Sequence, residues 1–144
     1  MHAGIREQIS QVPTTDEIYR LIATVREGSS SPERIDALVH LGASRDPRAV
    51  TPIAECCRDE DTDIRRSAIR ALHQVKSVRS IPALVERLKD RNEDIVIRKE
   101  AAAALADIRA FHTLEPLVEL SLDPTEDPEI RILVALMLGR NGKR

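Results

Sequence analysis

DTDIRRSAIRALHQV, residues 61–75, is the stretch of sequence that decides the fold of this chain. It carries a stripe of apolar side chains at steps of 4, 3, 1 and 3 residues, the pattern of a helix with one buried face: Ile64, Ala68, Ala71, Leu72 and Val75. After a short break, residues 81–88 show the same periodicity. The sequence therefore predicts two consecutive helices, called helix A and helix B here.

This two-helix unit is repeated along the chain. Arg65 of helix A has counterparts at Arg34, Arg98 and Arg131, which gives spacings of 31, 33 and 33 residues. Apolar positions of both helices, and a Glu and an Asp near the end of helix B, keep this register. The length varies only between that Asp and the next Arg, which marks a loop. Repetition at a period of 31 to 33 residues is typical of a solenoid of stacked helix pairs.

We expect one domain over residues 1–144, an all-α, short right-handed solenoid. Asp94 and Asp127 are N-cap signals for later helices A, and Thr14 and Glu17 form a capping-box pattern near the amino terminus. The predicted parts are irregular capping helices in residues 1–30 (3–12 and 14–27), full repeats at 32–60, 61–92 and 94–125, and an unpaired C-terminal helix A at 127–140.

Three stretches of the chain resemble HEAT-like repeats of the phycobilin-lyase type. They are DPRAVTPI at 46–53, DTDIRRSA at 61–68 and RKEAAAAL at 98–105. The resemblance covers roughly residues 32–139 and implies an α-solenoid. It says less about function, because this repeat class includes scaffolds, lyase subunits and a metal-dependent hydroxylase.

The resemblance also implies a ladder between neighbouring repeats, made by an Asp after helix B and an Arg six residues later. Asp59 and Arg65 have this spacing. Asp90 and Asp123 stand eight residues before the corresponding arginines, so the later steps of the ladder do not follow the family pattern.

The composition is that of a globular domain without a membrane span. The formal net charge is −2, and no apolar run approaches the ~18 residues that cross a bilayer. The first ten residues show no apolar core of a signal peptide, and Cys56 and Cys57 are adjacent, so we expect a cytoplasmic protein with reduced thiols. Cys57 aligns with an apolar core position of helix B, which predicts that it is buried.

The exposed face of helix B is the first candidate binding surface. In register, it carries a basic row beside an acidic row, and in solenoids the helix B side commonly lines the concave face where partners bind. The alternative is that this face is only exposed to solvent, and that its charges recur because the repeat was duplicated. The basic row is Arg48, Arg79 and His112, and the acidic row is Glu55, Glu86 and Glu119.

The C-terminal helix A is the second candidate surface. It becomes apolar at positions that are polar in the middle repeats, and large apolar side chains left in water forgo about 1.5 to 3 kcal/mol each. Either another segment of the chain covers this face, or it contacts a partner or a second copy of the chain. The residues concerned are Ile132, Leu133, Leu136 and Met137.

The sequence offers no catalytic residues, metal ligands or cofactor motif. The resemblance raises a di-iron site held by His-Glu pairs, but the four histidines are followed by Ala3, Leu41, Gln74 and Thr113. Residues 65–99 hold ten Lys or Arg against four Asp or Glu, and this basic excess makes binding to a nucleic-acid backbone an alternative function. The negative net charge and the lack of stacking aromatics make a nucleic-acid partner the weaker alternative.

The sequence therefore predicts a non-enzymatic scaffold that binds an unidentified protein through the helix B face and self-associates through the C-terminal helix. A subunit of a bilin lyase or related modifying complex, and a nucleic-acid backbone binder that uses the basic middle repeats, stay open as alternatives.

Overall fold

The computed structural model describes residues 12–108 and 114–142, and every regular element in these ranges is helical. The helix predicted at 3–12 and the candidate residue His112 therefore lie outside the described residues, apart from Val12. The α-helices are α2 (Thr15–Glu27), α3 (Ser31–Ser44), α4 (Val50–Cys56), α5 (Thr62–Val75), α6 (Ile81–Lys89), α7 (Ile95–Ile108), α8 (Leu114–Leu122) and α9 (Pro128–Gly142), with short 3-10 helices η1 (Pro47–Ala49) and η2 (Val78–Ser80).

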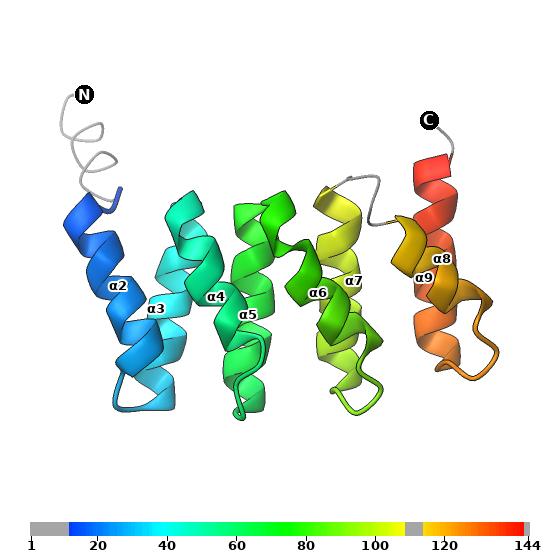
Figure 1. Ribbon diagram of the computed structural model, residues 1–144, viewed down its shortest axis with the longest axis horizontal. Helices are drawn as coiled ribbons and strands as arrows, with labels where there is room; N and C mark the ends of the chain where they lie inside the picture. The colour runs from blue at the N-terminus through cyan, green and yellow to red at the C-terminus, as the bar shows by residue number, and fades with distance from the viewer. Residues whose placement is uncertain (1–11, 109–113, 143–144) are drawn as a thin grey trace, which may run out of the picture.

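The helices form two layers that run the length of the molecule (Figure 1). One layer consists of the helices B, which are α2, α4, α6 and α8, and the other consists of the helices A, which are α3, α5, α7 and α9. Each helix B packs against the helix A that follows it, so we call α2–α3, α4–α5, α6–α7 and α8–α9 hairpins 1 to 4. These hairpins stand in a row with α2 and α9 at opposite ends, which confirms the predicted all-α solenoid.

The predicted C-terminal helix A is observed as α9, packed against α8. Its side chains Ile130 and Val134 are fully buried. The repeat boundaries predicted from the sequence stay a prediction, because the row of helices can be divided at either kind of loop.

Side-chain caps define the starts of several helices, including α2, α3 and α5. The predicted capping box is confirmed: the Thr14 hydroxyl accepts from the backbone N–H of Glu17, whose carboxylate accepts from the N–H of Thr14. Asp94 accepts from the N–H of Val96 at the start of α7, and Asp127 does the same for α9. These bonds satisfy N–H groups that have no partner within the helix.

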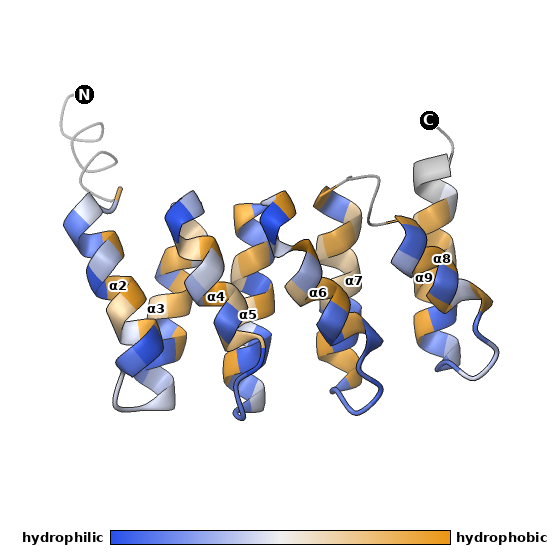
Figure 2. Ribbon diagram, viewed as in Figure 1, coloured by the Kyte–Doolittle hydropathy of each residue, from blue (hydrophilic) through white to orange (hydrophobic). Residues whose placement is uncertain are grey.

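The core lies between the two layers and is aliphatic, with Leu41, Leu72 and Leu105 in register and fully buried. Close contact between α3 and α5 depends on Gly42, where an added Cβ would lie 2.8 Å from the Cα of Ala71. Hydrophilic residues gather in the loops that join α4 to α5 and α6 to α7 (Figure 2). Within the described ranges, no helix has the length and apolar character needed to cross a membrane.

Candidate functional site

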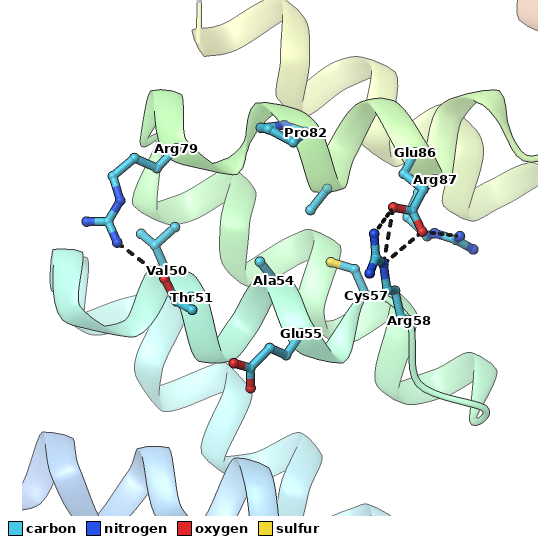
Figure 3. Close-up of a pocket in the computed structure, with 11 residues that line it drawn as sticks. Val50, Thr51, Ala54, Glu55, Cys57, Arg58, Arg79, Pro82, Glu86 and Arg87 are labelled. Atoms are coloured by element: carbon cyan, nitrogen blue, oxygen red, sulfur yellow. Dashed lines mark hydrogen bonds and ion pairs between the residues drawn. The ribbon is translucent and has the colours of Figure 1, made fainter.

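A hollow of about 410 Å³ lies on the helix B face, between α4 and α6 (Figure 3). Its walls include Val50 and Ala54 of α4, and Pro82 and Ala83 of α6. All four side chains lack a charge or a hydrogen-bonding group. The hollow can therefore accept an apolar side chain from a binding partner.

Charged side chains stand at the two ends of this hollow (Figure 3). At one end, Arg79 reaches from η2, just before α6, toward α4 and donates one hydrogen bond to the Thr51 hydroxyl, at 3.3 Å. At the other end, Arg58 and Arg87 both contact the carboxylate of Glu86. Arg79 forms no ion pair with a described residue, so its guanidinium is available to a carboxylate, whereas the opposite end is already neutralised.

The predicted acidic row is present, but it is an ion-pair ladder between hairpins. Each carboxylate contacts a basic side chain from the helix B of the preceding hairpin, or from the residues just after it. Sequence reasoning missed these bases, although they recur every 31 or 32 residues. The pairs are Arg26–Glu55 at 3.1 Å, Arg58–Glu86 at 2.6 Å and Lys89–Glu119 at 3.0 Å. We call this set the outer ladder.

Two members of the predicted basic row, Arg48 and Arg79, lie within the described residues. Arg48 contacts Asp46 at 2.6 Å and lies over the ring of Tyr19, 5.5 Å from its centre, so the guanidinium is occupied locally. Among the described residues the side chain of Arg79 bonds only Thr51, and His112 lies outside them. Of the two described members of this row, Arg79 is thus the more open.

A second ladder links the hairpins inside the molecule. Arg34, Arg65 and Arg98 of successive helices A each reach a backbone carbonyl before their helix and a carboxylate in the loop of the next hairpin. The bonds are Arg34 to Val25 O (2.9 Å) and Asp59 (2.8 Å), Arg65 to Asp59 O (2.9 Å) and Glu93 (2.8 Å), and Arg98 to Leu88 O (2.9 Å) and Glu126 (2.8 Å). We call this set the inner ladder.

The inner ladder corrects the family-based expectation. Arg65 does not pair with the carboxylate of Asp59, which binds Arg34 instead, and it contacts Asp59 through the backbone oxygen. The Asp after helix B and the next ladder Arg are two residues further apart before α7 and α9 than before α5, so the later steps depart from the family pattern. Before these two helices, Glu93 and Glu126 take the role that Asp59 has in the first step. Both glutamates are buried, with side chains 0% and 1% exposed.

Glu93 has the most strongly shifted carboxyl group of the described residues. Burial opposes its ionisation, but hydrogen bonds from Arg65 and Arg87 outweigh burial and lower its pKa to about 2. The two cysteines are buried, as predicted for Cys57, and burial raises the pKa of the Cys57 thiol to about 12. The thiol of Cys57 is therefore protonated and unreactive at neutral pH.

The four candidate residues of the C-terminal helix fall into two groups. Ile132 and Leu136 are 62% and 61% exposed, whereas Leu133 and Met137 are half-buried against the core. Ile132, Leu133 and Leu136 line an apolar hollow of about 310 Å³, together with the ion pair of Lys99 and Glu129. Across the described ranges, no group of three His, Cys, Asp or Glu side chains could hold a metal ion.

The stacked hairpins and their ladders define a helical-repeat protein of the solenoid class. The family model for HEAT repeats matches residues 18–106, and the chain belongs to that family. No curated protein matches the sequence.

Two solved structures share this fold. Human deoxyhypusine hydroxylase in complex with glycerol is 24% identical, with a TM-score of 0.75, over 97% of this chain and 47% of the hydroxylase chain. The complex of CpcE and CpcF of phycocyanin lyase from Nostoc sp. is 18% identical, with a TM-score of 0.70, over 94% of this chain and 56% of that chain. The chain thus spans about half the length of each.

A di-iron site held by His-Glu pairs does not fit this sequence. The residues after its histidines are Ala3, Leu41, Gln74 and Thr113. At 24% identity, the likeness to the hydroxylase is a likeness of fold.

Proposed function

We propose that this chain is a non-enzymatic interaction module that binds a segment of a partner protein in the hollow between α4 and α6. The hollow itself carries the proposal, because it combines apolar walls with one open arginine. Its volume of about 410 Å³ is in the range of sites that bind a few side chains.

The charges at the hollow specify the chemistry of the bound segment. An aliphatic side chain would pack on Ala54 and Ala83, and an acidic side chain would reach Arg79. A basic segment would gain little binding energy at the opposite end, because Arg58 and Arg87 already form ion pairs with Glu86. The fitting partner is therefore an extended, acidic and aliphatic peptide segment.

A displayed library of random dodecapeptides, selected on the purified chain, tests this proposal. We expect the selected peptides to share an aliphatic and an acidic position, and to bind in a fluorescence anisotropy assay. Arg79→Ala should weaken binding about tenfold, which corresponds to loss of a charge-assisted hydrogen bond. Ala83→Arg should abolish binding by filling the hollow.

Arg20→Ala is the matched control, because Arg20 is an exposed arginine of a helix B that does not line the hollow. It should leave binding unchanged. Selected peptides that bind Ala83→Arg as tightly as the parent chain would place the site elsewhere and contradict the proposal.

Nucleic-acid backbone binding loses support from the ion pairs of the basic middle repeats. Among the ten Lys and Arg of residues 65–99, all but Lys76 and Arg79 contact carboxylates. A phosphate backbone would have to displace these partners.

The second candidate function is a subunit of a lyase or related modifying complex. The fold shared with CpcE and CpcF supports it. A visible absorption band in the purified chain would favour this second candidate, whereas the interaction module is expected to be colourless. The cytoplasmic location stays a prediction.

A further inference from the structure

Every junction between neighbouring hairpins has the same electrostatic direction. The basic side chain comes from the earlier hairpin and the carboxylate from the later one, in both ladders at all three junctions. Arg66 and Arg70 of α5 hold Glu100 of α7, and Lys99 of α7 holds Glu129 of α9. Each hairpin thus presents bases toward the next one.

Hairpin 4 departs from this rule on its outward face. Leu122 occupies the register position of Arg58 and Lys89, the bases of the outer ladder. Ile132 and Leu136 occupy the positions of Arg66 and Arg70. The three apolar side chains are 73%, 62% and 61% exposed, and they are the only exposed Leu or Ile side chains among the described residues. We call Leu122, Ile132 and Leu136 the end face.

The arginine of hairpin 4 that corresponds to the inner ladder is incompletely paired among the described residues. Arg131 stands in register with Arg34, Arg65 and Arg98, but no described carboxylate forms an ion pair with it. Its Nε is buried without a hydrogen-bond partner. An internal arginine of this ladder has both a carbonyl and a carboxylate, so the end face is an incomplete junction.

An ordinary hairpin of this chain does not complete the junction. It would set its acidic positions, those of Glu86 and Glu100, against Leu122, Ile132 and Leu136, with no base opposite. Carboxylates set against aliphatic side chains in this way lose part of their hydration without gaining a partner. The occupant of the end face must therefore be apolar where the internal hairpins are acidic.

We propose that the end face is a homodimer interface, in which hairpin 4 of one copy packs on hairpin 4 of a second copy across a two-fold axis. The end face of a second copy is apolar at the required positions, and a two-fold axis places the same surface of both copies in contact. In this proposal Arg131 takes its carboxylate from the second copy, where the exposed Glu115 of hairpin 4 forms no ion pair with a described residue.

Light scattering and sedimentation of the full chain at increasing concentration test the interface. The parent chain should be a dimer, and Leu136→Lys should weaken the dimer at least about tenfold, because it places two lysines in an apolar contact. Circular dichroism should show an unchanged helix content, since Leu136 is exposed.

Val39→Lys is the matched control. Val39 has the register position of Leu136 in α3 and is 56% exposed, but it lies in hairpin 1. Its replacement should leave the dimer intact. A parent chain that stays monomeric at the highest concentration overturns the proposal, and so does a dimer that survives the combined Ile132→Lys and Leu136→Lys changes.

A cysteine at the end face separates two-fold packing from any other contact. With a copper–phenanthroline oxidant, Ile132→Cys should give a disulfide-linked dimer, whereas Val39→Cys should stay monomeric on denaturing gels. Native Cys56 and Cys57 are 4% and 2% exposed and give little background. A cross-linked product with both variants would contradict the proposal. None of the substituted residues lines the hollow between α4 and α6, so these experiments do not test the proposed binding site in that hollow.

Discussion

The inner and outer ladders join the same hairpins with the same kind of ion pair, but they lie in different surroundings. The inner pair Arg98–Glu126 has side chains 4% and 1% exposed. The outer pair at the same junction, Lys89–Glu119, has side chains 46% and 55% exposed. Distances of 2.8 and 3.0 Å hardly differ, so burial is the variable that separates the two ladders.

This difference indicates what each ladder does. A buried charge cannot return to water, so the inner ladder fixes the spacing of the hairpins and penalises any other register. Exposed pairs exchange with solvent at little cost, so the outer ladder can release a carboxylate or a base when a partner binds. The proposed binding hollow lies on the side of the outer ladder.

The largest effect should follow from breaking one buried pair. Arg98→Met leaves the carboxylate of Glu126 buried without its main partner, and we expect a loss of about 3 to 5 kcal/mol in the free energy of unfolding. Urea denaturation followed by circular dichroism measures this loss.

The double variant Arg98→Met with Glu126→Met is the control for that change. It removes both charges, so most of the lost stability should return. If the double variant is as unstable as Arg98→Met alone, the pair does not act through charge, and the contrast between the ladders fails.

Much of the inner ladder could be predicted from the sequence. Arg34, Arg65 and Arg98 recur in register, and the apolar stripes predicted the helices that carry them. The carboxylates Glu93 and Glu126 were missed because the family pattern pointed to an Asp. The available signal was the Glu-Asp pair that precedes both later helices A, at 93–94 and 126–127.

The outer ladder and the hollow were harder to predict. Glu55, Glu86 and Glu119 were identified, but the bases that pair with them lie 28 to 30 residues earlier in the chain, and these contacts depend on how neighbouring hairpins stack. The contacts of Arg48 with Asp46 and with the ring of Tyr19 depend on side-chain conformation, which sequence periodicity does not determine. The hollow depends on the small residues Ala54 and Ala83 facing each other across two hairpins.

An intermediate effect is expected from acid, through Glu93. Its folded pKa of about 2 lies below the ordinary value of 4.5, so its contribution to stability is complete above pH 4.5 and is lost as the pH falls toward 2. That contribution is on the order of 3 kcal/mol. The stability difference between the parent chain and Glu93→Gln should shrink over this range, and a difference that is independent of pH would contradict the assignment.

The smallest effect is expected in the outer ladder. Glu119→Ala removes an exposed partner of Lys89, and the free energy of unfolding should fall by less than about 1 kcal/mol. Raising the salt concentration should remove even this loss, because salt screens exposed charges. A double-mutant cycle with Lys89→Ala isolates the pair from other effects of the substitutions. A coupling energy as large as that of Arg98 with Glu126 would mean that burial does not distinguish the ladders, and that the helix B face is held too firmly to exchange its ion pairs for a partner.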